Sequence, residues 1–141
     1  MTVDIDTSVL VAYYCPEPLS KKAEAFLTEH VQPAISALTE LELFSAISRK
    51  VREKGMDHKD AGRVAAKFVA HLDNHYYRYL SIDAHHFRLA RDWIGLFKLN
   101  LRSLDALHLA VASSEGLAIV TIDQSLSKSA KGLGLNSILL D

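Results

Sequence analysis

The chain has 141 residues, a length that suits one compact domain over residues 1–141, with 49% hydrophobic and 23% charged residues as in ordinary globular proteins. Its formal net charge of −1 excludes a global positive field for nucleic acid, so any such binding must come from local basic patches. A single cysteine, Cys15, argues against an internal disulfide. We see no apolar run of 18 residues for a membrane span, and the first residues are acidic where a signal peptide would be basic and then apolar. We therefore expect a cytoplasmic protein.

Strands and helices alternate along the predicted chain. In chain order we expect a strand over 2–5, helices over 7–14 and 19–31, a strand over 33–37, helices over 38–55 and 57–76, a strand over 77–82, helices over 83–97 and 103–116, a strand over 117–122, a helix over 123–134 and a strand over 136–140. Gly55 and Gly116 are expected to end the helices before them, and Asp57 to cap the helix after it. The alternation predicts an α/β fold in three layers, with a central, mainly parallel β-sheet between helices.

Acidic residues stand where parallel strands end. Asp6 follows the first strand and Asp123 follows LAIVTI, and ligand sites of parallel sheets form outside the carboxyl ends of their strands. Asp4 and Asp6 are one residue apart, so they point to the same face of a strand. Only Asp6 lies at the strand end, so we expect Asp6 to be the ligand and Asp4 to be a flanking acid.

Each acid also has a simpler interpretation as a helix cap. Asp6 and Asp123 precede predicted helices, Asp105 falls in a first helical turn, and Glu42 stands three residues after Thr39, the spacing of a capping box. Taken together, caps explain the set less well. The helix over 104–112 is apolar almost all the way round, so Asp105 is expected to enter an enclosed place where a carboxylate needs a partner or a metal ion.

Converging carboxylates repel one another unless some are protonated or a cation lies between them. Oxygen ligands without His or Cys suit Mg²⁺ or Mn²⁺, and water bound to such ions can attack a phosphodiester. Glu42, Ser45 and Arg49 share one face of their predicted helix, so the positive side chain of Arg49 lies on the same side as the acid Glu42. The residues therefore indicate metal-assisted hydrolysis of a phosphate ester.

Four segments resemble the acidic motifs of the PIN domain family, in order and spacing and over nearly all of the chain. They are DTSVLVAYY, ISALTELELFSAI, LDALHLAVA and LAIVTIDQSLSKSAKGLG. The similarity is greatest to the short VapC-type toxins of toxin–antitoxin modules. It implies that the acidic quartet of catalytic and metal-binding residues corresponds to Asp6, Glu42, Asp105 and Asp123, with support from Thr7 and Thr121.

The resemblance further implies an Mg²⁺- or Mn²⁺-dependent endoribonuclease, silenced by a small cognate antitoxin and forming a homodimer. For the helix that carries Phe68, Val69 and Leu72 we expect an apolar patch that a partner covers. Because an acidic centre cannot attract RNA unaided, we expect a basic rim that contacts phosphates. The candidates for this rim are Arg49, Arg52, Arg102, Lys128 and Lys131.

Two other functions remain open from the sequence. A PIN fold could bind RNA or a partner without cutting, although a full acidic quartet argues against that. The DIDT segment also fits the DxDx[TV] motif of haloacid-dehalogenase-like phosphatases, in which Asp4 would be the nucleophile, but only Thr2 and Val3 precede Asp4 where that motif ends a long strand. Among the histidines, we expect His71 and His75 to occupy a partly exposed polar face. His108, one turn after Asp105, either touches the site or is a packed helix residue with a satisfied hydrogen bond, and we favour the second interpretation.

Overall fold

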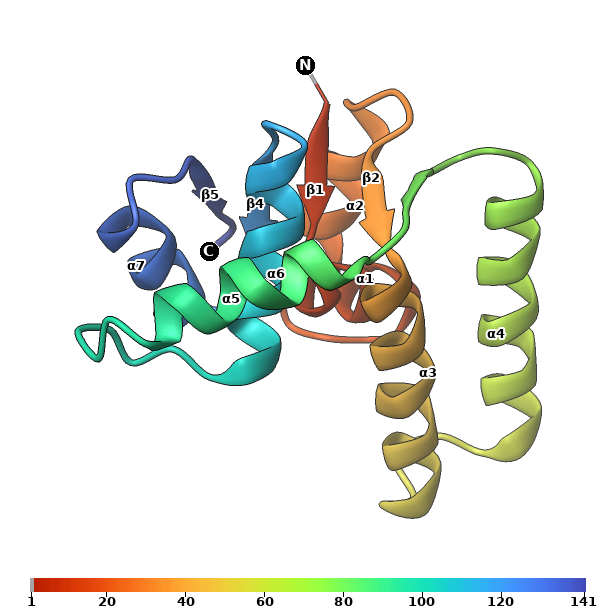
Figure 1. Cartoon of the computed structure of the whole chain (residues 1–141). Coiled ribbons are helices and arrows are strands. Elements are labelled where there is room, and N and C mark those ends of the chain that lie inside the picture. Colours follow the sequence, from red (N-terminus) through yellow and green to blue (C-terminus); the bar gives the residue numbers. More distant parts are fainter. Residues whose placement is uncertain (1) are drawn as a thin grey trace.

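Strands and helices alternate in the computed structural model, which describes residues 2–141 (Figure 1). Every predicted element is present, with ends shifted by a few residues. The elements are β1 (Val3–Ile5), α1 (Thr7–Tyr14), α2 (Ser20–Thr28), β2 (Ala34–Ser36), α3 (Ala37–Arg52), α4 (His58–Asp73), β3 (Arg78–Leu80), α5 (Ala84–Ile94), α6 (Ser103–Ser114), β4 (Ala118–Thr121), α7 (Gln124–Gly132) and β5 (Ser137–Leu139).

The strands form one sheet in the order β3-β2-β1-β4-β5, and all four pairings are parallel. The chain first builds outward from β1 to β2 and β3, and then returns to place β4 on the other side of β1. The strand order therefore reverses between β1 and β4. In open parallel sheets, ligands bind at the carboxyl edge beside such a reversal. Asp6 follows β1 and Asp123 follows β4, so both acids lie at that position.

Helices cover both faces of the sheet, which confirms the predicted three layers. On one face, α1 and α3 pack against the sheet, α2 packs on α1 and α4 packs on α3, and these helices share one apolar cluster with Val3, Ile5, Ile35 and Val120. On the other face, α6 and α7 pack against Ile119, and α6 also contacts Ala34 and Leu80. In Figure 1, α5 and α6 cross in front of the strands while α3 and α4 extend away from the sheet as a pair.

Local signals placed most helix ends correctly. Asp57 caps α4 by accepting a hydrogen bond from the Asp60 N–H (2.8 Å), and Gly116 follows α6 with a φ of +66°. The predicted stop at Gly55 was wrong, because α3 ends at Arg52 and Lys54 takes the left-handed conformation (φ +60°) instead. Among residues 2–141, no helix is both long and apolar enough to cross a membrane.

Candidate metal centre and active-site cleft

Asp6 is fixed at the end of β1 by two hydroxyl groups. Its Oδ2 accepts hydrogen bonds from Ser8 Oγ (2.6 Å) and Thr121 Oγ1 (2.8 Å), and the carboxylate is buried. Thr121 was a predicted supporting residue, but Ser8 was missed. Ser8 also accepts a hydrogen bond from the Ile122 N–H (3.1 Å), so it ties the start of α1 to the end of β4. Its place two residues after Asp6, in the first turn of a helix, is the signal that could have identified it.

Glu42 lies on α3 and is held from two sides. Its Oε1 accepts hydrogen bonds from Thr7 Oγ1 (2.7 Å) and from His108 Nε2 (2.5 Å). Burial by itself would raise the pKa of Glu42, but the hydrogen bonds from His108 and Thr7 outweigh burial and lower it. Glu42 is therefore ionised at neutral pH, and the predicted supporting role of Thr7 corresponds to a direct contact.

The simpler capping interpretation of Glu42 was wrong. Helix α3 begins at Ala37, one residue earlier than expected, and its N-cap is Ser36 and not Thr39; Ser36 Oγ accepts from the Thr39 N–H (3.3 Å). The capping box therefore consists of Ser36 and Thr39, and Glu42 lies within the helix. Its neighbour Glu40 faces elsewhere and accepts a hydrogen bond from the Tyr79 hydroxyl on β3 (2.6 Å).

Asp105 lies in the first turn of α6 and is half-buried. Burial raises the pKa of its carboxyl group, Arg102 lowers it, and the nearby charges of Asp123 and Asp6 raise it further. The net shift is upward, so three of the predicted acids act on one another electrostatically. The expectation of a helix buried from its first residue was partly wrong, because Leu104 is exposed while residues 106–112 are buried. Asp105 therefore lies at the mouth of the enclosed region.

Asp123 is a helix cap and also has an unused oxygen. Its Oδ1 accepts hydrogen bonds from the backbone N–H groups of Ser125 (2.8 Å) and Leu126 (3.2 Å) at the start of α7. The backbone N–H of Asp123 in turn donates to Thr121 Oγ1 (3.0 Å). The cap occupies one carboxylate oxygen, so it does not exclude a ligand role for the other.

His108 is the residue that the sequence interpretation undervalued. Its imidazole is 5% exposed and projects from α6, one turn after Asp105, to contact Glu42 and approach Asp6 Oδ1 (4.0 Å). Burial would lower the pKa of His108, but its hydrogen bond to Glu42 and the charge of Asp6 raise it. Only the pattern Asp-Ala-Leu-His, which puts Asp105 and His108 on one helical face, signals this role in the sequence.

Asp4 lies inside β1 and not at its end. Burial raises the pKa of Asp4 to about 7, with His108 lowering it and Asp6 raising it. A phosphatase nucleophile would need to stand at an accessible strand end, whereas Asp4 is 3% exposed within the strand. The structure therefore gives no support to the phosphatase alternative and fits the expectation that Asp4 is a flanking acid.

The donor chemistry of the acidic quartet fits a hard divalent cation, because all four groups are carboxylates. The four carboxylates are not drawn tightly together. Within residues 2–141, three possible ligand atoms lie within 4.8 Å of one another only in a different group, Asp83, His85 and His86. That group is explained by the start of α5, where His86 Nδ1 accepts from the Asp83 N–H (2.9 Å). Mg²⁺ commonly keeps several water ligands and uses only one or two carboxylates directly, so an open quartet suits it.

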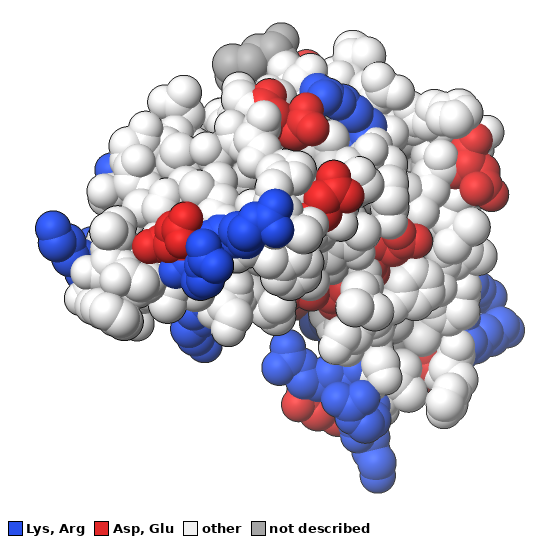
Figure 2. Space-filling model, viewed as in Figure 1, with Lys and Arg blue, Asp and Glu red and all other residues white. Residues whose placement is uncertain are grey.

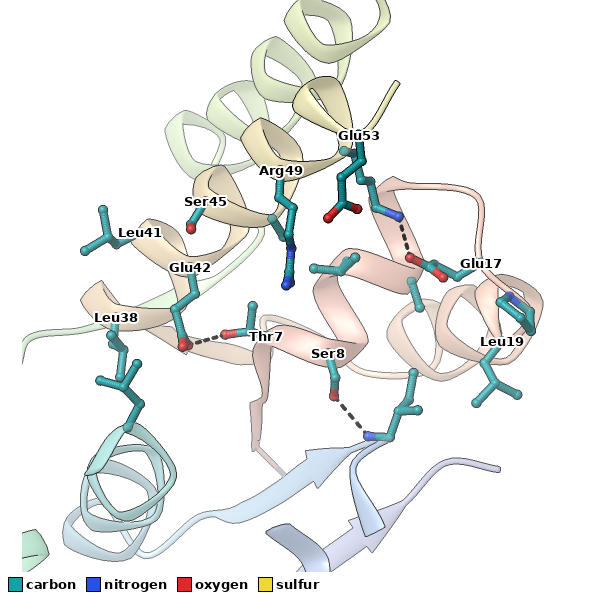
Figure 3. Close-up of a pocket in the computed structure, with 17 residues that line it drawn as sticks. Thr7, Ser8, Glu17, Leu19, Leu38, Leu41, Glu42, Ser45, Arg49 and Glu53 are labelled. Carbon is teal, nitrogen blue, oxygen red and sulfur yellow. Dashed lines mark hydrogen bonds and ion pairs between the residues drawn. The ribbon is translucent and has the colours of Figure 1, made fainter. Parts of the chain in front are cut away.

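A cleft of about 940 Å³ opens beside Glu42, between α1 and α3 (Figure 3). Leu38, Leu41, Val11 and Leu104 give it an apolar lining, while Thr7, Ser8 and Glu42 mark its acidic end. Arg49 points from α3 into this cleft on the same side as Glu42, as the helical spacing predicts. Lys50, further along the lining, is paired with Glu17 (2.7 Å).

The remaining basic candidates lie on the surface around these elements. Arg102 is near Asp105 (Nε to Oδ2, 3.6 Å), Arg52 donates to Ser48 (2.9 Å), and Lys128 and Lys131 are exposed on α7. Figure 2 shows basic side chains gathered at the lower end of the molecule, where α3 ends; its last turn carries Arg49, Lys50 and Arg52. The expected apolar patch on α4 is smaller than predicted, because Phe68 is fully buried and only Val69 is largely exposed.

The fold and site define a class: three-layer α/β proteins with an acidic centre where the order of a parallel sheet reverses. Within that class, the chain belongs to the PIN domain family, whose sequence model matches residues 4–132. It is 33% identical over 134 residues to Ribonuclease VapC46 of Mycobacterium tuberculosis (strain ATCC 25618 / H37Rv), and the match covers 93% of this chain and 92% of that relative.

Solved structures agree on the fold. VapC20 from Mycobacterium tuberculosis, a Sarcin-Ricin loop cleaving toxin, superposes with a TM-score of 0.73 and 17% identity, covering 91% of this chain and 95% of that one. VapBC2 from Rickettsia felis, solved bound to a DNA fragment from its promoter, gives a TM-score of 0.72 at 17% identity, with 100% of both chains covered. At these identities the superpositions establish the three-layer fold alone.

Proposed function

We propose that the chain is a metal-dependent endoribonuclease that hydrolyses RNA phosphodiester bonds, and that it is the toxin of a VapBC-type toxin–antitoxin module. The observation that carries the proposal is the acidic centre beside the sheet reversal, where Asp6 and Glu42 are each anchored by two donors. The relative with 33% identity is a ribonuclease, which supports the same reaction.

The quartet of Asp6, Glu42, Asp105 and Asp123 would hold Mg²⁺ or Mn²⁺, which when bound activates water and stabilises the charge of the leaving oxygen. The protein's own residues prepare this reaction. Ser8 and Thr121 orient Asp6, and Thr7 and His108 orient Glu42, so that these carboxylates need little rearrangement to bind. Asp105, whose pKa is raised by burial and by neighbouring acids, gains most from a cation that offsets the repulsion.

RNA would reach this centre along the cleft. Arg49 supports this path best, because it lies in the cleft on the same helical face as Glu42. Arg102 near Asp105, and Lys128 and Lys131 on the helix that Asp123 caps, extend the proposed rim to the other acids. Arg52 is exposed one turn from Arg49 and completes the set.

The apolar lining of the same cleft supports a protein partner as well. Leu41 is 68% exposed and Leu104 is 50% exposed, and both line the cleft next to Glu42. We propose that a segment of a cognate antitoxin covers these side chains and sends a basic group to the carboxylates, where it competes with the metal ion. A homodimer in the cytoplasm, as expected from the sequence, is part of the same proposal, and sedimentation of the purified protein tests the dimer.

The decisive experiment is cleavage of a structured RNA by the purified protein with Mg²⁺, with Mn²⁺ and with a chelator. We expect cleavage with either ion, none with the chelator, and none from the Asp105→Asn variant in any condition. Chelator-resistant cleavage shared by wild type and variant would point to a contaminating nuclease. RNA binding without metal-dependent cleavage would support the alternative, a PIN fold that binds RNA or a partner without cutting.

A further inference from the structure

Three of the four proposed ligands share an asymmetry: one carboxylate oxygen is occupied and the other is not. Asp6 Oδ2 receives Ser8 and Thr121, Glu42 Oε1 receives Thr7 and His108, and Asp123 Oδ1 receives two backbone N–H groups of α7. Within residues 2–141, the second oxygen of each carboxylate receives no hydrogen bond from the protein. The fourth acid, Asp105, differs, because within residues 2–141 neither of its oxygens accepts a hydrogen bond, and Arg102 Nε lies 3.6 Å from its Oδ2.

Two donors on one oxygen restrict how a carboxylate can bind a cation. A bidentate carboxylate must turn both oxygens toward the ion, and the oxygen that already accepts two hydrogen bonds would then have to give up one of them. A monodentate carboxylate keeps them and uses the remaining oxygen. The structure thus favours one oxygen from each anchored acid, which suits an ion that demands octahedral geometry and keeps water ligands.

Among these donors His108 is unusual in its origin. The other donors are hydroxyl groups of α1 and β4 and backbone N–H groups of α7, whereas His108 brings an imidazole ring from α6 across to Glu42 on α3. A carboxylate only accepts hydrogen bonds, so Nε2 of His108 must carry the proton that it donates. The same ring lies 4.0 Å from Asp6 Oδ1, so one buried side chain lies between two proposed ligands.

We propose that His108 is a positioning residue of the metal centre: together with Thr7 it holds Oε1 of Glu42, so that Glu42 offers a divalent ion Oε2 alone. This inference rests on the proposed function, since it concerns the same metal centre. It assigns a task to a histidine that is not itself a ligand. Helix α6 then supplies both a ligand, Asp105, and, one turn later, the residue that orients a second ligand.

The test is Mn²⁺ binding without RNA, measured by electron paramagnetic resonance and by calorimetry on wild type, His108→Leu and His108→Gln. Loss of an outer hydrogen bond to a ligand typically weakens metal affinity by about 10–100-fold, and we expect His108→Leu to fall in this range. The amide of Gln can donate from its own Nε2, so His108→Gln should stay within about threefold of wild type.

A control is His30→Leu, since the half-buried ring of His30 bonds to the Phe26 carbonyl of α2 and belongs neither to the acidic quartet nor to the group around His86. We expect that variant to lose stability while keeping the Mn²⁺ affinity of wild type. Thr7→Val removes the other donor to Oε1 and should also weaken Mn²⁺ binding, which keeps the proposal testable even where His108→Leu fails to fold.

Two results would overturn the inference. One is a folded His108→Leu protein, or Thr7→Val in its place, that binds Mn²⁺ with the wild-type dissociation constant. The other is His108→Gln binding as weakly as His108→Leu, because the donated hydrogen bond would then not be what matters. Failure of the proposed function looks different: wild type would bind Mn²⁺ with the expected dependence on His108 and yet leave RNA intact.

Discussion

Helix α1 joins two polar clusters that differ in how completely their atoms are paired. At its first turn lies the acidic end, formed by Asp6, Thr7 and the carboxylates around them. At its last residue lies the tyrosine end, where the Tyr14 hydroxyl is 2.6 Å from His71 Nδ1 and 2.5 Å from the Tyr77 hydroxyl. The tyrosine end pairs its polar atoms with one another, whereas at the acidic end, within residues 2–141, one oxygen on each of three carboxylates accepts no hydrogen bond. The first arrangement stabilises a fold, and the second is ready for a ligand.

The electrostatics of the two ends agree with this contrast. At the acidic end, burial raises the pKa of both Asp4 and Asp105, which means that the ionised form of each group costs stability in the folded protein. At the tyrosine end the groups are neutral, and aromatic packing adds to their hydrogen bonds: Phe68 meets Tyr14 edge-on, with ring centroids 5.5 Å apart. Substitutions at the two ends should therefore affect different measurements.

The largest effect is expected from Asp105→Asn at the acidic end. Loss of a ligand charge should reduce RNA cleavage by at least about a thousandfold, equivalent to about 4 kcal/mol of activation free energy. The metal-free variant should be at least as stable as wild type, because one source of repulsion is gone. Initial cleavage rates and urea unfolding measure the two quantities. Asp73→Asn on exposed α4 is the control, and full activity in Asp105→Asn would refute the metal centre.

At the tyrosine end the expected pattern is reversed. Tyr14→Phe keeps the ring but removes the hydroxyl that bridges His71 and Tyr77, and should lower the free energy of unfolding by about 1–3 kcal/mol. Cleavage per folded molecule should stay at the wild-type level. Tyr79→Phe loses only an exposed bond to Glu40 and should change stability by less than about 0.5 kcal/mol. Equal losses of unfolding free energy in Tyr14→Phe and Tyr79→Phe would show that the buried hydrogen bonds of Tyr14 stabilise the fold no more than the exposed hydrogen bond of Tyr79.

The fold could be predicted well because its signals are local and repeated. The alternation of strands and helices predicted the three layers, and the positions of the acidic residues predicted which strand ends carry the site. The misplaced end of α3 shows the limit: Gly55 is a good stop in isolation, but the chain leaves the helix at Arg52 and Lys54 makes the turn. Helix ends depend on competing residues nearby, so a single glycine does not decide them.

The sequence indicated the four proposed ligands and, through the family resemblance, the supporting residues Thr7 and Thr121, but it indicated neither Ser8 nor the contact between His108 and Glu42. Asp6, Glu42, Asp105 and Asp123 each follow a local motif, so the sequence indicates them. The donors that orient these acids come from far along the chain, with His108 66 residues from Glu42 and Thr121 115 residues from Asp6. The hydrophobic periodicity of a sequence does not predict contacts between residues so far apart in the chain. For Asp123, the cap and the ligand were treated as alternatives, but one carboxylate oxygen can cap α7 while the other binds a metal ion.

Asp4→Asn removes one buried carboxylate from the acidic end and leaves the four proposed ligands unchanged. Replacing a buried carboxylate by a neutral amide should raise the unfolding free energy of the chelator-treated protein by about 1–2 kcal/mol at pH 8. Cleavage should stay within about threefold of wild type. Abolished cleavage with an intact fold would instead revive a nucleophilic role for Asp4.

Arg49→Ala should have a smaller effect, limited to RNA binding. One lost phosphate contact flattens the slope of log affinity against log salt by roughly 0.7 for single-stranded RNA. Binding is best measured in the Asp105→Asn background, where the RNA is not cut. Arg63→Ala on α4 is the control, because Arg63 pairs with Asp60 and does not line the cleft. Identical slopes in Arg49→Ala and the parent protein would exclude Arg49 from the rim.

The smallest effect concerns the pH dependence of the tyrosine end. Burial, and then the charge of Lys67, lower the pKa of His71, so its neutral Nδ1 can accept the Tyr14 hydroxyl. A histidine with a lowered folded pKa adds stability that is fully present above its unfolded pKa of about 6.5 and is lost as pH falls through the folded pKa. We therefore expect the unfolding free energy of wild type to decline between pH 7 and 5 more steeply than that of His71→Asn, whose amide oxygen can accept the same hydroxyl without titrating. Parallel urea-unfolding curves for the two proteins across that range would show that His71 makes no contribution, and that the tyrosine end is insensitive to pH.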